Sequence, residues 1–219
     1  MNRRSIQRIT FAGAVMATFT FTACAEQQQE ATATAQEEHE GMDHSSMDHS
    51  NMNHGQMVTK QVVETPDYTS VAEPLKAQVA ALVDSYLSLK DALVASNAET
   101  AKAAAASVLA AAEKVDLAVL EGDQRAFAEE KLEEVKQSAS GIAEAGEVGA
   151  QRERLELLSE ATFSLTKAFG ATDQKLYYQH CPMANSNQGA YWLSSNQEIR
   201  NPYFGEQMLK CGSTEEVLN

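Results

Sequence analysis

The middle of the sequence lacks the side chains that bind soft metal ions. Between Ser70 and Thr172 there is no histidine, no cysteine and no methionine. This absence excludes haem ligation, Glu-x-x-His metal pairs and Cys-x-x-Cys redox motifs from that region. Only one of the five histidines, His180, lies outside an N-terminal tract. No catalytic triad can be assembled from so few histidines, and we expect no enzyme activity.

Basic residues and cysteines are also scarce. Lysine and arginine total 17 against 31 acidic residues, which gives a net charge of −14. So acidic a chain argues against nucleic acid as a partner, although an acidic surface attracts cations. Cysteine occurs only at positions 24, 181 and 211, so at most one intramolecular disulfide can form.

The first 23 residues are typical of a secretory signal peptide of the lipoprotein type. Arg3, Arg4 and Arg8 precede the run ITFAGAVMATFTFTA, which is too short for a permanent membrane span. Phe21-Thr22-Ala23 before Cys24 resembles a bacterial lipobox, which implies lipidation of Cys24. We therefore expect a protein exported to the periplasm or cell envelope and attached to a membrane through lipid only. The alternative is cleavage after the small-residue triplet Ala23-Cys24-Ala25, which would release a soluble periplasmic protein.

A pentapeptide repeat covers residues 39–58, within a polar segment, 24–69, that we expect to form a mobile, disordered tether. Its histidines and methionines each recur every five residues, at His39, His44, His49 and His54 and at Met42, Met47, Met52 and Met57. Successive repeats would turn by about 500° on an α-helix and would alternate faces on a strand, so secondary structure does not explain them.

Metal binding does explain the repeat. Imidazole and thioether suit Cu(I), and Ag(I) is expected to behave alike, whereas imidazole with the carboxylates of Asp43 and Asp48 suits Cu(II). All eight residues are therefore candidate metal ligands. The alternative is a low-complexity polar linker or nonspecific binding of zinc or nickel.

Residues 70–172 are rich in alanine and show helical spacing of apolar residues. The spacing predicts helices from Ser70 to about 93, from Ser96 to about Gly122, from Asp123 to about Gly146 and from about Gly149 to Gly170. Short connections favour an antiparallel four-helix bundle, and we predict an all-α fold.

The C-terminal segment, 173–219, brings back the missing residue types. We predict that it is irregular and packs on the bundle through its aromatic side chains. Its candidate metal ligands for Cu(I) or Ag(I) are His180, Cys181, Met183, Met208 and Cys211. A single helical turn would place Met208 and Cys211 on the same side. One alternative is a Cys181–Cys211 disulfide that closes this segment and could exchange with metal binding as the redox state changes, and another is a pair of inert thiols.

The motifs YYQHCPMA, GAYWLS, EIRNPYFG and MLKCG follow the helical region in that order. Together they resemble an uncharacterised helical domain family of exported proteins that accompanies, or is fused to, periplasmic adaptors of copper and silver efflux pumps. The resemblance covers about Ser70 to Leu218 and implies a metal-linked role for Cys181, Met183, Met208 and Cys211. The CPM triplet also resembles the CPMHP core of small heavy-metal-binding modules, although Ala184 stands in place of the histidine.

The repeat separately resembles the MDHSxM-type segments of periplasmic copper-resistance proteins, matched from Met42 to Met47 and from Met47 to Met52. These features favour a lipoprotein that binds Cu(I) or Ag(I) and buffers the ion or passes it to an efflux adaptor. The alternative is an interaction domain of an efflux assembly, with a disulfide-closed docking segment and no specific metal site.

Overall fold

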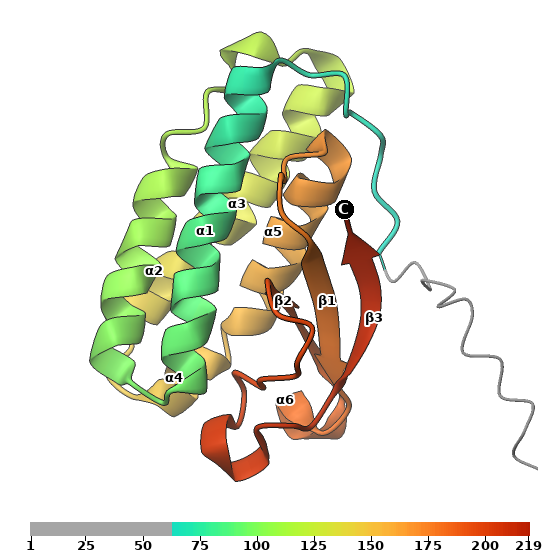
Figure 1. Cartoon of the computed structure of the whole chain (residues 1–219). Coiled ribbons are helices and arrows are strands. Elements are labelled where there is room, and N and C mark those ends of the chain that lie inside the picture. Colours follow the sequence, from blue (N-terminus) through green and yellow to red (C-terminus); the bar gives the residue numbers. More distant parts are fainter. Residues whose placement is uncertain (1–62) are drawn as a thin grey trace, which may run out of the picture. The chain divides into compact units, whose positions relative to one another are not determined.

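The structure, a computed structural model, describes residues 63–219 (Figure 1). Five helices come first, interrupted by one 3₁₀ turn: α1 (Glu73–Val94), α2 (Ala98–Ala112), η1 (Leu117–Val119), α3 (Gly122–Glu144), α4 (Val148–Arg152) and α5 (Leu155–Phe169). The remaining elements are β1 (Leu176–Cys181), α6 (Ala184–Asn187), β2 (Ala190–Ser194), η2 (Gly205–Met208) and β3 (Ser213–Leu218). No described helix is long and apolar enough to cross a membrane.

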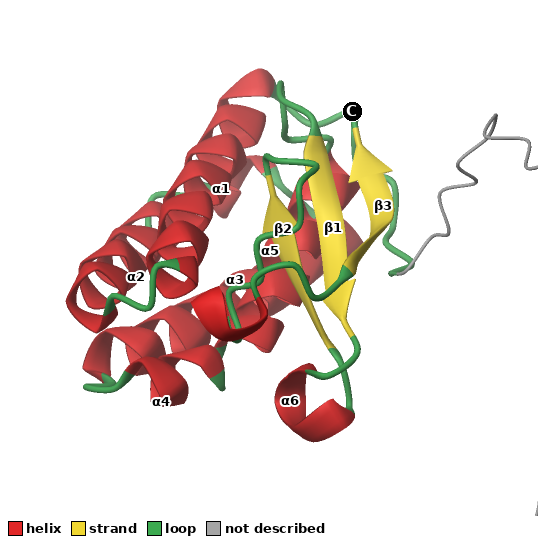
Figure 2. Ribbon diagram, turned by 60° about the horizontal axis from the view of Figure 1, so that its bottom comes forward, coloured by secondary structure: helices red, strands yellow, loops and turns green. Residues whose placement is uncertain are grey.

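The prediction of an all-α fold is wrong, because the C-terminal segment forms a three-stranded antiparallel sheet. The strand order is β2-β1-β3, with β1 in the centre. Figure 2 shows the sheet beside α5. Residues 173–219 hold four of the six tyrosines and the single tryptophan of the sequence, and aromatic residues favour a pleated, half-buried surface over an irregular coil. The fold is therefore mixed, with helices followed by a small sheet.

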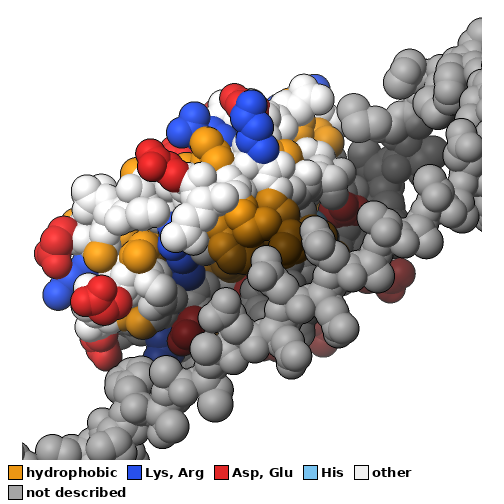
Figure 3. All heavy atoms as spheres, turned by 90° about the horizontal axis from the view of Figure 1, so that it is seen from below, with side chains coloured by type: hydrophobic (Ala, Val, Ile, Leu, Met, Phe, Trp, Pro, Cys, Tyr) orange, Lys and Arg blue, Asp and Glu red, His pale blue; other side chains and the backbone are white. Residues whose placement is uncertain are grey.

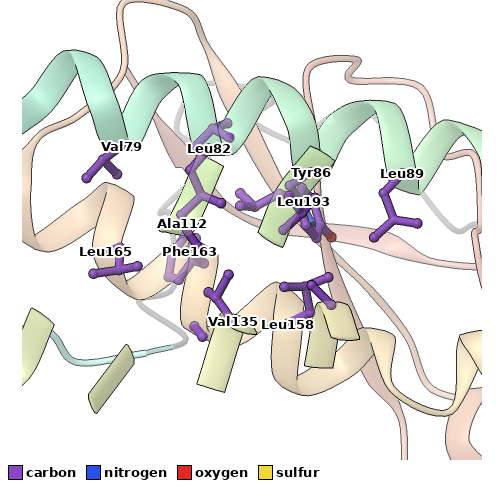
Figure 4. Packing of buried hydrophobic residues seen from close by; sticks show 14 of the residues in the cluster. Val79, Leu82, Tyr86, Leu89, Ala112, Val135, Leu158, Phe163, Leu165 and Leu193 are labelled. Atoms are coloured by element: carbon purple, nitrogen blue, oxygen red, sulfur yellow. Dashed lines mark hydrogen bonds between the residues drawn. The ribbon is translucent and has the colours of Figure 1, made fainter. Parts of the chain in front are cut away.

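The long helices pack side by side along one hydrophobic core. Helix α1 packs against α2, α2 against α3, and α3 against α5, while α1 also contacts α5. Figure 4 shows the side chains of α1 directed toward those of α3 and α5. The core includes Val79, Leu82, Tyr86, Leu89, Val135, Leu158, Phe163 and Leu165, all of which are fully buried.

Two predicted helices differ from the observed ones in their boundaries. The second predicted helix ends at Ala112 rather than near Gly122, and Val119 is largely exposed on the 3₁₀ turn that follows. Asp116 caps the start of that 3₁₀ turn, because its carboxylate accepts a hydrogen bond from the Ala118 N–H at 2.9 Å. The fourth predicted helix is divided into α4 and α5 at residues 153–154.

The sheet contacts the helices through one aromatic face. The Tyr178 ring of β1 stacks on Phe163 of α5 with ring centroids 4.0 Å apart. The backbone N–H of Leu193 in β2 donates to the Tyr86 hydroxyl at 3.1 Å, which ties β2 to α1. At the other edge, Lys167 of α5 forms an ion pair with Glu216 of β3 at 2.7 Å. Both edge strands are therefore fixed to the helices.

Candidate metal centre

The structure describes some of the predicted ligands and not others. Cys24 and all eight histidines and methionines of the repeat lie outside the described residues. The predicted ligands of the C-terminal segment, His180, Cys181, Met183, Met208 and Cys211, all lie within them. Their arrangement decides which of them can bind the same metal ion.

Cys181 and Cys211 come together although thirty positions separate them in the chain. Cys181 is the last residue of β1, and Cys211 stands two residues before β3, its antiparallel neighbour. Both are free thiols, and a hydrogen bond links the two side chains. Cys181 is fully buried, whereas Cys211 is partly exposed. We call these two residues the thiol pair.

Met183 lies next to the thiol pair, at the surface. Its backbone N–H donates a hydrogen bond to the Cys211 sulfur, and 47% of the residue is exposed. Pro182 alone separates it from Cys181, and the ring fixes φ near −65° at that position. The HCPM stretch therefore places a thiol and a thioether on either side of one turn.

His180 does not lie with the thiol pair. Successive side chains of a strand point to opposite faces, so His180 lies on the aromatic face that carries Tyr178. Its ring packs on Tyr191 with centroids 4.3 Å apart. Gly189 lies directly beneath the imidazole, since a Cβ there would come within 2.3 Å of Nε2. The strand therefore does not place His180 and Cys181 on the same face as joint ligands.

Met208 and Cys211 do not share one helical turn as predicted. The 3₁₀ turn η2 ends at Met208, and Cys211 follows it in the connection to β3. The Cys211 N–H still donates to the Met208 carbonyl at 3.0 Å. Met208 is partly buried. Of the two methionines, Met183 is the one whose backbone N–H contacts the Cys211 sulfur.

The surroundings of the thiol pair were not predicted as part of a site. Cys181 belongs to a small apolar cluster with Ala184, Ala190 and Trp192, against which Ile199, Tyr203, Phe204 and Cys211 pack. The buried Asn201 holds the covering loop, because its side-chain amide donates to the Cys211 carbonyl at 2.9 Å. The asparagine before Pro202 marked a turn in the sequence, but nothing in the sequence indicated that this turn covers Cys181.

A left-handed turn follows Met183. Asn185, Ser186 and Asn187 have φ values of 50°, 55° and 65°, a region in which non-glycine residues cost about 1–2 kcal/mol each. The Asn185 amide donates to Glu156 of α5 at 3.0 Å, which holds the turn against the helices. The polar run NSNQG was a sequence indication of a turn at this position. Strain of this kind is common where a structure must present a particular side chain.

The electrostatics of the pair favour the protonated thiol of Cys211. A hydrogen bond with Cys181, then burial, and then repulsion by a charged Cys181 raise the pKa of Cys211, while the Met183 N–H lowers it. A metal ion must therefore displace a proton from Cys211. Two thiols and one thioether suit a monovalent soft ion, because such ions accept few, sulfur-rich ligands. Among residues 63–219 no three His, Cys, Asp or Glu side chains cluster as a zinc site would require.

A pocket of about 630 Å³ opens beside the pair. Its lining includes Met183, Phe204, Glu153, Glu156 and Arg152. The pocket belongs to the end of the molecule that carries α4 and α6, and Figure 3 shows hydrophobic side chains gathered in one patch on that face. The pocket is thus bounded by both carboxylates and apolar side chains.

Glu156 should make stability depend on pH in this region. Burial raises the pKa of its carboxyl, and Glu160 adds to the effect, while Asn185 and His180 oppose it. A folded-state pKa above the unfolded value of 4.5 means that the charged form costs stability above the folded pKa. The cost is relieved as the pH falls through that pKa.

We therefore expect Glu156→Gln to raise Tm at pH 7, because glutamine keeps an acceptor for Asn185 without the charge. The gain should shrink as the pH approaches 4, and thermal unfolding at both pH values measures it. Glu153→Gln, at an exposed neighbouring position of the same pocket, is the control. An equal gain for both variants would contradict the role of burial.

Comparison with known families gives one match. Residues 82–174 match the family described as protein of unknown function (DUF3347). The match covers the helical region from within α1 to the residues before β1, and thus an uncharacterised helical domain. It does not include the thiol pair. No curated protein and no solved structure matches the chain.

Proposed function

We propose that the protein is an exported, lipid-anchored envelope protein that binds Cu(I) or Ag(I), buffers it, and passes it to a partner such as an efflux adaptor. The observation that carries the proposal is the contact between Cys181 and Cys211, with Met183 beside them. Thiolates dominate the affinity of such sites, and an adjacent thioether adds a neutral soft donor. The helices act as the scaffold.

The repeat supports the same ion. Its imidazoles and thioethers are donors for Cu(I), and several weak ligand sets close in sequence can rebind a released ion at high local concentration. Val63 begins the described residues, and its carbonyl accepts a hydrogen bond from Lys167 at 2.8 Å. Only five residues separate Met57, the last ligand of the repeat, from Val63 in the sequence. The molecule would then contain two types of site: a repeat that binds several ions weakly and a thiol pair that binds one ion tightly.

The test is an anaerobic titration of the reduced protein with Cu(I). The mature chain is compared with a chain that starts at Val58 and keeps every described residue. We expect the shorter chain to retain one tightly bound ion and to lose the additional, weaker ones. Loss of all binding in the shorter chain would contradict a site at the thiol pair.

A second function is favoured by the same contact. Two thiols in contact could equally be joined by a disulfide that closes the 30-residue segment, and the C-terminal sheet would then serve as a docking surface without metal. Thiol counting on protein taken from an oxidising compartment separates the two functions. Two free thiols that Cu(I) protects from alkylation favour the metal site, and thiols that appear only after reduction favour the disulfide.

A further inference from the structure

We infer that the ion reaches the thiol pair through the pocket beside α4 and that Met183 is the ligand that transfers it inward. This inference rests on the proposed function, because it concerns the route into the proposed site. It assigns Met183 a role in the rate of loading, which is distinct from the equilibrium affinity given by the two thiols.

The direct route to Cys181 is closed. Its side chain is fully buried beneath Trp192 and the loop that carries Tyr203 and Phe204. On the other side, the backbone of β1 and Gly212 is so close that a Cβ on Gly212 would come within 2.7 Å of the His180 carbonyl oxygen. An ion must therefore approach from the end at which Cys211 and Met183 lie.

Met183 is the residue that touches both the pocket and the pair. It lines the pocket, it is nearly half exposed, and its backbone N–H contacts the Cys211 sulfur. Phe204 also faces both sides, since it lines the pocket and packs against the cluster of Cys181. A phenyl ring offers no ligand to a soft ion, so the thioether is the only soft donor in the pocket wall.

The polar groups of the pocket wall are held in place. Arg152 donates to the carbonyls of Pro202 at 2.7 Å and of Leu93 at 2.9 Å, and the Tyr203 hydroxyl donates to the carbonyl of Tyr191 at 2.6 Å. Glu156 accepts from Asn185 at 3.0 Å. The carboxylates of Glu153 and Glu156 attract a cation to the pocket. The flexible, unbranched Met183 side chain can then exchange the ion inward.

The transfer is a ligand exchange without redox change. A monovalent ion held by the Met183 thioether passes to the Cys211 sulfur, and that thiol releases its proton to solvent. The Cys181 sulfur then completes a two-thiolate site with loss of a second proton, and the Met183 thioether remains beside it as a weaker, neutral donor. The oxidation state of the ion is the same before and after each step.

Stopped-flow fluorescence with Ag(I) on the reduced full mature chain tests the inference. Trp192 is the only tryptophan of the chain and lies in the cluster of Cys181, so its emission reports on the thiol pair and not on the repeat. We expect Met183→Leu to lower the association rate constant about tenfold or more, because leucine fills the same space without a sulfur donor. Met208→Leu is the matched control and should load like the unmodified chain.

The outcomes separate the inference from the function on which it rests. An unchanged association rate for Met183→Leu, with Ag(I) still bound at the pair, overturns the route and leaves the metal site standing. A change confined to the dissociation rate also overturns it, since Met183 would then be a ligand only. No Ag(I) bound at the pair in the unmodified chain overturns both.

Discussion

Replacing Cys181 and Cys211 together by serine should abolish tight Cu(I) or Ag(I) binding in the chain that starts at Val58. Serine keeps the approximate size of cysteine and a hydrogen bond, but its oxygen is a poor ligand for a soft ion. Structural zinc sites bind with about 10–16 kcal/mol shared among four ligands, which corresponds to a loss of about 100-fold or more per ligand. The loss of both thiolates should therefore exceed about 10⁴-fold.

Equilibrium competition against a Cu(I) chelator measures this loss. Each single variant, Cys181→Ser or Cys211→Ser, should retain weak binding through the remaining thiolate and Met183. In the full mature chain, the double variant should lose only the tightest ion, because the repeat is unchanged. If the double variant of the shorter chain bound one ion as tightly as the unmodified chain, the thiol pair would not be the site.

The same titration should depend on pH. Because the pKa of Cys211 is raised, its thiol is protonated at neutral pH and must lose a proton when the ion binds. Apparent affinity should therefore increase by at least about tenfold for each pH unit between 6 and 8. A pH-independent affinity over this range would show that Cys211 does not bind the ion as a thiolate.

Tyr86→Phe should lower the free energy of unfolding by about 2 kcal/mol. The Tyr86 hydroxyl of α1 contacts Ser159 of α5 at 2.7 Å and accepts from the Leu193 N–H of β2 at 3.1 Å. Phenylalanine fills the same volume but leaves that N–H buried without its acceptor, and an unsatisfied buried donor costs more than the hydrogen bond itself gains. Because burial raises the pKa of Tyr86, the hydroxyl stays neutral and the loss should not vary between pH 6 and 8.

Urea unfolding followed by circular dichroism measures the effect. Tyr68→Phe is the matched control, because the Tyr68 ring packs against Phe127 and Phe169 at the surface of the same core and keeps these contacts as phenylalanine. We expect the control to change stability by less than about 0.5 kcal/mol. Equal effects of the two substitutions would mean that the Tyr86 hydroxyl does not join the sheet to the helices.

The helical part of the fold could be predicted because its pattern is local. Apolar residues of α1 recur every three or four positions, and the predicted seam of Leu75, Val79, Leu82, Tyr86, Leu89 and Leu93 is buried throughout. The same spacing was misleading at Val119, which is exposed on the 3₁₀ turn that Asp116 caps. A short polar side chain can offer the backbone an alternative hydrogen bond that apolar periodicity does not reveal.

The sheet could not be predicted in the same way because its pairing is long-range. Strand β1 occupies six residues and β2 five, too short for either periodicity to stand out. The sequence STEEVL of β3 reads as a polar end of the chain, and only its pairing with β1 buries Glu216. The tyrosine and tryptophan content, with glycines at 189, 205 and 212, was the available indication of strands and turns.

The residue types of the candidate site could be predicted from the sequence, but which of these residues lie together could not. Cysteines and methionines near one another in the last 45 residues pointed to the two thiols that the structure brings into contact, and metal binding by them stays a prediction. His180 was grouped with them because it is adjacent in sequence, yet the alternation of a strand separates adjacent side chains. Once the segment is known to be a strand, the separation follows directly.

The position of the two thiols gives the C-terminal strand an additional role. Cys181 is the last residue of the central strand β1, and Cys211 stands two residues before the neighbouring strand β3. An ion bound between the two sulfurs would therefore cross-link the two ends of the 30-residue segment that joins these positions. The bound ion would then oppose local unfolding of that segment, as a disulfide bond does. Proteases that cut the segment between Gln188 and Lys210 should distinguish the empty protein from the loaded one.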